Sequence, residues 1–491
     1  MTESKNLSQA NKVFSGVFWK FAERFLAQIV SFVVSVVLAR ILLPKDYGAI
    51  SIVMVFIAFA DVLVVSGFST SLVQKKDANL TDFSTIFYCS LIVAVILYGI
   101  LFVTAPFVAD FYKMPILKNA IRILSLRIII GSYNSIQHAY VSRKMLFKRF
   151  FFSTLFGTVI SGIIGVVLAI KGFEIWALVI QYLSNTFIDS VVLTLTIDWK
   201  PSFVFSFTSA KKLMNFGWKV TAANFSGTFF GQLRNLIVGK VYTPADLAFY
   251  NRGQQISGVL CDNLSSAIMS VLFPAFSNFS DDKERIKAMT RRAVRIMSYV
   301  IFPIAFGCAV LAKSFVLVVF TEKWMNAISF IQILCLSSTI GLIGTVGMQS
   351  IQALGRSDIL LKLEFIKKPI YLILLILGVK ISVFGVALTM LLYSIYATIL
   401  NASPLKKIIN YKYKEQIEDL FPAFTLSVVM SLIVYLSSYI LLNEYLRLIV
   451  GIFIGISVYI LLSKIFKVDS YFYIINFIKN KLLKSNGEKN E

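Results

Sequence analysis

The stretch Ala39-Arg-Ile-Leu-Leu-Pro-Lys-Asp-Tyr-Gly-Ala-Ile50 lies between two long apolar runs of the chain. About two hundred residues later the plan recurs as Gly239-Lys-Val-Tyr-Thr-Pro-Ala-Asp-Leu-Ala-Phe-Tyr250. The matched pairs are Arg40 and Lys240, Pro44 and Pro244, and Asp46 and Asp246. This spacing predicts a duplicated unit of about six helices, and two such halves facing each other are a common transporter design. The alternative is a coincidence between two turns, since Pro and Asp are common in any turn.

The composition is that of a membrane protein. Of the 491 residues, 57% are hydrophobic and only 15% are charged, and the mean hydropathy is +0.79. Soluble domains are not built this way. The formal net charge of +23 would suit nucleic acid, but the Lys and Arg residues lie in short loops between apolar runs, as topology signals do. No nucleic-acid partner is therefore expected.

The apolar runs predict an all-α polytopic membrane protein. A transmembrane helix needs roughly 20 mostly apolar residues, and on that rule the sequence holds about fourteen helices. With the repeat, they predict one lobe of six helices over 1–200, a second over 201–402, and two further helices with a basic tail over 403–491. The polar start of the chain lacks the small-residue cleavage site of a signal peptide, so we expect its first helix to be retained.

The charges in the loops predict the orientation. Loops after even-numbered helices are the more basic ones, as at Arg143 and Lys144, whereas loops after odd-numbered helices carry one or two cations, as at Lys171. Since basic loops stay in the cytoplasm, both termini are predicted to be cytoplasmic. No loop is long enough for a folded extramembrane domain, and no phosphate-binding GxxxxGK[ST] motif occurs. Transport would have to be driven by a gradient or by the membrane potential.

Ionisable residues inside the apolar helices are the best pointers to function, because each costs about 2.5–3.5 kcal/mol at the bilayer centre. Lys20, Glu23 and Arg24 share one face of the first helix through their spacing of three and four. The other candidates for a central cavity are Arg234 in the seventh helix and Arg252, Gln255 and Asp262 in the eighth. Asp61 in the second helix and Asp189 in the sixth are the candidates for binding a coupling ion.

Together these residues predict a polar cavity richer in Arg than in acid. Such a cavity suits a substrate with an anionic group, because Arg binds phosphate through two parallel hydrogen bonds. The alternative for Lys20 and Arg252 is that they snorkel from near the helix ends. Glu23 and Arg24 would then merely neutralise charges on neighbouring helices. His138 is predicted to be a structural hydrogen bonder, with a proton relay as the alternative.

Nothing in the pattern predicts an enzyme. The four cysteines fall inside apolar runs without metal-ligand spacing, so no metal site and no cofactor are predicted. No paired carboxylates and no activated nucleophile stand out.

Several motifs carry a resemblance to a known family. They are the stretch from Ala39 to Gly48, Ser71-Leu-Val-Gln-Lys-Lys-Asp77, Tyr140-Val-Ser-Arg-Lys-Met-Leu-Phe-Lys-Arg-Phe150 and Gln352-Ala-Leu-Gly-Arg-Ser-Asp358. As a set they resemble the polysaccharide transporter family of the multidrug/oligosaccharidyl-lipid/polysaccharide (MOP) exporter superfamily, and within it the branch similar to colanic acid exporters. The resemblance covers most of the first twelve predicted helices.

The resemblance implies two six-helix lobes of the MATE type plus two C-terminal helices. It implies a Wzx-type flippase in the inner membrane, which moves an undecaprenyl-type lipid-linked glycan for lipopolysaccharide, capsule or exopolysaccharide synthesis. Membrane lipids and the polysaccharide polymerase machinery are the further partners it implies. Related lipid flippases carry basic residues on the first and eighth helices, where Arg24 and Arg252 lie here. The second copy of the repeat departs from the pattern, with Leu247-Ala248 in place of Tyr47-Gly48.

Two other functions stay open. A MATE-like drug/cation antiporter would share the architecture, but such pumps rely on acidic cavity residues, and the excess of cations within these helices argues against one. A membrane polysaccharide polymerase or ligase would be expected to carry a large periplasmic loop, which the sequence lacks.

Overall fold

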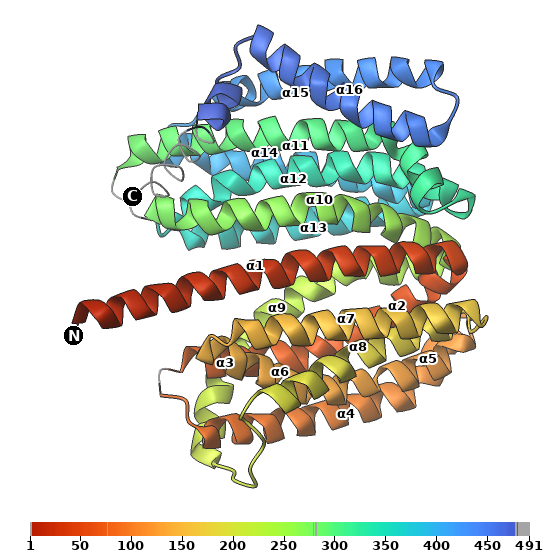
Figure 1. The fold of residues 1–491 in the computed structure, drawn as a ribbon, viewed down its shortest axis with the longest axis vertical. Coiled ribbons are helices and arrows are strands. Elements are labelled where there is room, and N and C mark those ends of the chain that lie inside the picture. The colour runs from red at the N-terminus through yellow and green to blue at the C-terminus, as the bar shows by residue number, and fades with distance from the viewer. Residues whose placement is uncertain (1, 76, 278, 280–281, 477–478, 480–491) are drawn as a thin grey trace. The chain divides into compact units, whose positions relative to one another are not determined.

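The computed structural model describes residues 2–75, 77–277, 279, 282–476 and 479. Within these ranges the side chains of 2–18, 21, 24, 260, 262–275 and 277 are not described. Every regular element in the described ranges is a helix, as the apolar runs predict (Figure 1). The elements are α1 (Thr2–Ile41), α2 (Pro44–Asp61), η1 (Val62–Ser66), α3 (Gly67–Gln74), α4 (Leu80–Tyr112), α5 (Ile116–Leu124), α6 (Leu126–Lys144), α7 (Phe147–Ile170), α8 (Ile175–Thr196), α9 (Phe207–Val241), α10 (Pro244–Ser277), α11 (Lys283–Val319), η2 (Glu322–Ala327), α12 (Ile328–Ala353), α13 (Ser357–Ile381), α14 (Val383–Ile408), α15 (Tyr413–Ile440) and α16 (Glu444–Ile465).

The two copies of the repeat adopt the same local structure. In the first, α1 ends at Ile41 and α2 begins at Pro44; in the second, α9 ends at Val241 and α10 begins at Pro244. Proline suits the first position of a helix, because its backbone φ is already helical and its missing N–H would have no partner there. The matched prolines therefore set the same break between two long helices.

The matched aspartates stabilise these two helix starts in the same way. Asp46 Oδ2 accepts a hydrogen bond of 3.1 Å from the backbone N–H of Leu43. Asp246 Oδ2 accepts one of 3.2 Å from the backbone N–H of Thr243. A carboxylate in the first turn also lies favourably at the positive end of the helix. The repeat seen in the sequence is thus a repeat of structure as well.

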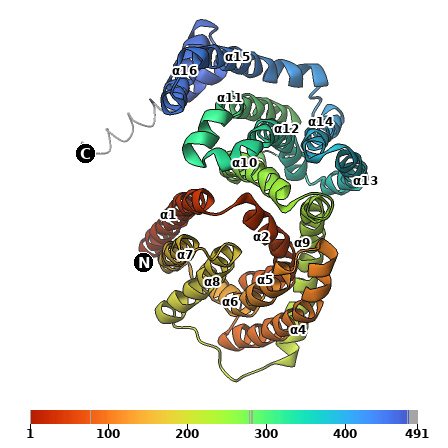
Figure 2. The same cartoon turned by 90° about the vertical axis from the view of Figure 1, so that its right-hand side faces the viewer.

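The described chain divides into two compact units, Met1–Ala248 and Phe249–Glu491. In the first unit α9 packs along α2, α3 and α4, and α6 packs on α8 (Figure 2). In the second unit α11 packs on α12 and α15, and α15 pairs with α16. The lobe boundaries expected from the sequence at 200 and 402 stay a prediction.

Glycines bring the segment Pro44–Gln74 close to the start of α10 near one of its ends and to α9 near the other. A Cβ built on Gly48 would lie 1.7 Å from the carbonyl oxygen of Pro244. At the other end, a Cβ on Gly67 would lie 2.0 Å from Thr221 Oγ1 and 2.5 Å from the carbonyl oxygen of Gly217. Close contact between helix backbones requires small residues, as is usual for helices packed in a membrane.

Nine helical segments in the described residues are long and apolar enough to cross a membrane. They are Pro44–Gln74, Leu80–Tyr112, Phe147–Ile170, Ile175–Thr196, Lys283–Val319, Glu322–Ala353, Val383–Ile408, Tyr413–Ile440 and Glu444–Ile465. A shorter apolar helix covers Phe25–Ile41. The chain is therefore a multi-pass membrane protein, while the total of fourteen helices stays a prediction.

Candidate functional site

Asp189, one of the two predicted ion-coupling residues, is buried between α6 and α8 of the first unit. Its Oδ2 accepts a 3.0 Å hydrogen bond from Asn134 Nδ2 and lies 2.8 Å from His138 Nε2. Both partners come from α6. A buried carboxylate needs such donors, since an isolated charge in an apolar medium is costly. His138 therefore has the hydrogen-bonding role predicted for it.

Gln137 links the same two helices next to this pair. Its Nε2 donates to the Ser190 carbonyl oxygen at 3.1 Å and to Thr194 Oγ1 at 2.8 Å. Its Oε1 accepts from Ser190 Oγ at 3.1 Å. Neither Gln137 nor Asn134 was among the predicted site residues. The available signal was that Asn134 lies three residues before Gln137 and four before His138, which puts the three side chains near one face of the helix.

Asp61, the other predicted ion-coupling residue, faces a cation. Its Oδ2 lies 3.6 Å from Arg127 Nη2, and the two side chains are 29% and 26% exposed. Arg127 Nε also donates to Thr186 Oγ1 at 2.9 Å. A π-helical turn, Val62–Ser66, follows Asp61 directly. Such turns occur often at functional sites.

These contacts bring Asp61 and Asp189 onto one polar track. Arg127 joins Asp61 to Thr186, and Thr186 and Asp189 lie three residues apart on α8, hence on one face of that helix. A cation that bound Asp61 would compete with the Arg127 guanidinium for the carboxylate. The track thus has the chemistry of a charge switch within a single unit.

On α1, Lys20 and Glu23 pair with each other. Lys20 Nζ lies 3.0 Å from Glu23 Oε2 and 3.8 Å from the centre of the Phe150 ring on α7. Glu23 is buried. Lys20 and Glu23 therefore neutralise each other within α1, whereas the alternative from the sequence was that Glu23 and Arg24 neutralise charges on neighbouring helices. The side chain of Arg24 lies outside the described residues.

Arg252 is only 4% exposed, the least of the predicted basic residues whose side chains the structure describes. Its guanidinium lies 4.8 Å from the ring centre of Phe320 and 4.5 Å from that of Trp324. Its Nη1 donates to Gln255 Oε1 at 2.8 Å. A guanidinium over aromatic faces is held by electrostatic attraction to the rings. Asp262, the third predicted residue of this helix, has a side chain outside the described part.

Arg234 is half-buried on α9 and lies in the chain between Gln232 and Asn235, whose side chains form a hydrogen bond of 2.9 Å from Asn235 Nδ2 to Gln232 Oε1. It belongs to the first unit, whereas Arg252 and Gln255 belong to the second. A single cavity that gathers all these residues stays a prediction.

An ion cluster that the sequence did not predict joins α11 to α15. Asp419, whose side chain is fully buried, accepts from Arg291 Nε and Nη2 at 2.8 and 2.9 Å and from Arg295 Nε at 2.6 Å. The Tyr411 hydroxyl donates to it at 2.8 Å. Burial raises the pKa of the Tyr411 phenol and the Asp419 carboxylate raises it further, so this hydroxyl stays a donor. The cluster therefore links α15 to α11 within the second unit.

Comparison with known proteins identifies the family. Residues 37–329 match the family described as polysaccharide biosynthesis proteins, which is more than half of the chain. The chain belongs to this family.

The chain is similar to proteins named for polysaccharide biosynthesis, and two of them are also named for transport or as a flippase. The lipopolysaccharide biosynthesis protein WzxC of Escherichia coli (strain K12) is 25% identical over 430 residues, which cover 86% of each chain. The succinoglycan biosynthesis transport protein ExoT of Rhizobium meliloti (strain 1021) is 24% identical over 67% of each chain. The probable low-salt glycan biosynthesis flippase Agl15 of Haloferax volcanii is 21% identical over 53% of this chain and 56% of its own.

Solved structures of membrane transporters share the fold of this chain. The lipid II flippase MurJ in an inward closed conformation matches 92% of this chain and 99% of its own, with a TM-score of 0.74 and 17% identity. An inward-facing MATE transporter of the MOP superfamily matches 77% of this chain and 92% of its own, with a TM-score of 0.57 and 16% identity. The predicted fold class and family are therefore confirmed.

Proposed function

We propose that this protein is a flippase that moves a polyprenyl-pyrophosphate-linked oligosaccharide across the membrane by alternating access. The proposal is supported by two matches. The lipopolysaccharide biosynthesis protein WzxC aligns over 86% of the chain, and the fold of the lipid II flippase MurJ matches 92% of it. An undecaprenyl-type carrier, the inner membrane as location, cytoplasmic termini and association with the polysaccharide polymerase machinery belong to the same proposal.

The charge of the chain supports an anionic substrate. The net charge of +23 comes with basic residues inside the helices as well as in the loops. We assign Arg24 and Arg252 to the pyrophosphate, with Lys20, Glu23, Arg234, Gln255 and Asp262 as their polar surroundings. Because Arg252 is enclosed by Phe320 and Trp324, it would reach substrate only after the second unit rearranges around it. Alternating access supplies such a rearrangement.

We assign Asp61 and Asp189 to coupling. The 3.6 Å pair of Asp61 and Arg127 supports this role, because a cation arriving at Asp61 would release the guanidinium and the π-helical turn beside it. Glycan transfer across the membrane would then be tied to ion binding within the first unit.

The experiment that tests the function uses a strain that lacks this gene. Its lipid-linked glycans are extracted and sized, and an enzyme that cannot cross the membrane probes the leaflet they occupy. Complete repeat units trapped on the cytoplasmic side are the expected result. Complete but unpolymerised units on the outer side would indicate a polymerase or ligase instead. Unchanged lipids together with altered drug resistance would indicate an antiporter.

A further inference from the structure

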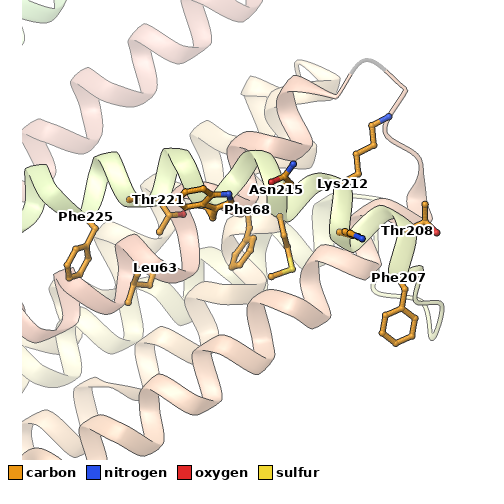
Figure 3. Close-up of a pocket in the computed structure, with 12 residues that line it drawn as sticks. Leu63, Phe68, Phe207, Thr208, Lys212, Asn215, Thr221 and Phe225 are labelled. Atoms are coloured by element: carbon orange, nitrogen blue, oxygen red, sulfur yellow. The ribbon is translucent and has the colours of Figure 1, made fainter. Parts of the chain in front are cut away.

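A groove with a cavity volume of about 1220 Å³ runs along the first half of α9 in the first unit. Its walls come from α9, from η1 and from α3. Figure 3 shows Phe207, Thr208 and Lys212 at one end of the groove and Leu63 and Phe225 at the other. The proposed function does not use this groove.

The chemistry of the groove changes along its length. Lys211 and Lys212 line its start and are exposed. Two turns further on α9 comes Trp218, whose side chain is 59% exposed, and two more turns bring Phe225. The lining residues include two cations and no acid. In membrane proteins, cations lie at the level of the headgroups, Trp lies at the interface, and apolar groups lie in the hydrocarbon. The lysines, Trp218 and Phe225 follow in this order along the groove.

The floor of the groove is formed by a close contact between the backbones of α9 and α3. Gly217 on α9 meets Gly67 on α3 backbone to backbone, with a Cβ on Gly217 lying 2.9 Å from the Gly67 carbonyl oxygen. Leu213, one turn earlier on α9, is buried on the same side. These contacts hold α9 against α3, and the groove runs beside them, since Thr221 lines the groove and also lies next to Gly67.

We propose that this groove binds an anionic phospholipid of the cytoplasmic leaflet. Its phosphate would lie at Lys211 and Lys212, beside the Asn215 amide, and its chains would follow Trp218 toward Phe225. The positive-inside rule counts Lys200 before α9 together with Lys211 and Lys212 as cytoplasmic charges, which puts these lysines at the headgroup level. Lysine attracts a single phosphate as a point charge and lacks the paired geometry with which Arg fits a pyrophosphate. This favours a bulk phospholipid over the glycan carrier.

The test measures lipid binding on the purified full-length protein in detergent, so its outcome does not depend on transport. Phosphatidylglycerol with brominated chains quenches nearby tryptophans, and the difference between the unchanged chain and Trp218→Phe isolates the share of Trp218. We expect that share to be quenched at lower concentrations of brominated phosphatidylglycerol than of brominated phosphatidylcholine. Lys211→Gln and Lys212→Gln should each raise the half-saturating concentration by about fivefold. The double variant Lys211→Arg with Lys212→Arg keeps both charges and should bind like the unchanged chain.

The matched control is Lys406→Gln with Lys407→Gln, an exposed pair of neighbouring lysines in the last turn of α14. Binding at Trp218 should stay unchanged in this variant. Equal quenching by the zwitterionic lipid, or no effect of the two glutamine substitutions at 211 and 212, would overturn the proposal. Displacement of phosphatidylglycerol by a small excess of polyprenyl diphosphate would assign the groove to the carrier lipid and overturn it as well.

Discussion

At the scale of single residues, Asp419 shows how buried charges hold the second unit together. It receives hydrogen bonds from Arg291, Arg295 and Tyr411. Asp419→Asn keeps the shape of the side chain but removes the charge that both guanidinium groups face. We expect a loss of about 1.5–3 kcal/mol in the free energy of unfolding, measured by thermal or denaturant unfolding in detergent.

The control for this prediction is Asp358→Asn. Asp358 pairs with Arg356 at 3.0 Å, but both side chains are about half exposed. An ion pair exposed to solvent contributes little to stability, so its loss should have little effect on unfolding. Similar losses from both variants would show that the cluster around Asp419 does not stabilise the fold.

The proposed grip on pyrophosphate also belongs to this scale. Arg24→Gln and Arg252→Gln should each reduce glycan transport by about tenfold or more, because each removes a charge-assisted hydrogen bond worth about 1.5–3 kcal/mol. Transport is measured by complementing a strain that lacks this gene and any paralogue, with protein levels checked. Arg356→Gln, at an exposed position, serves as the control. Full transport with Arg24→Gln would remove the pyrophosphate role of Arg24.

At the scale of helices, the close contact of α2 with the start of α10 makes a sharp prediction. A methyl group on Gly48 would overlap the backbone carbonyl of Pro244, which cannot rotate away. Gly48→Ala should therefore cost about 1–3 kcal/mol of unfolding free energy. Gly99→Ala on α4 is the control, since nothing lies within 4 Å of its added methyl group, and it should gain about 0.5–1 kcal/mol.

The sequence predicted the helices well, because each long apolar run must satisfy its own backbone in lipid. It did not predict that the fourth expected helix is divided into α5 and α6 at Ser125. Nor did it predict the π-helical turn Val62–Ser66 within the second expected helix. It also missed the hydrogen bond between Asn134 and Asp189, which lie 55 residues apart in the chain. Periodicity assigns a side chain to a face of a helix, but which helix packs against that face depends on the whole fold.

At the scale of the whole molecule, the family match and the fold match support the proposed function from different data. The family match rests on residues 37–329, whereas the fold match covers 92% of the chain and includes helices beyond that range. A flippase needs two halves that move against each other, and the chain has two compact units. The leaflet experiment tests this scale, because only a defect in crossing traps finished glycans inside the cell.

The contact between Gly48 and Pro244 joins the two copies of the repeat, and this has a consequence for the history of the chain. A duplicated gene begins as two identical halves, so the turn now at 44–48 first met its own duplicate. An ancestor of half the length would have made the same contact between two separate chains. The two copies differ today at this place: Gly48 has no side chain, whereas Ala248 at the matching position carries a methyl group and is buried, so only the first copy can meet a backbone this closely.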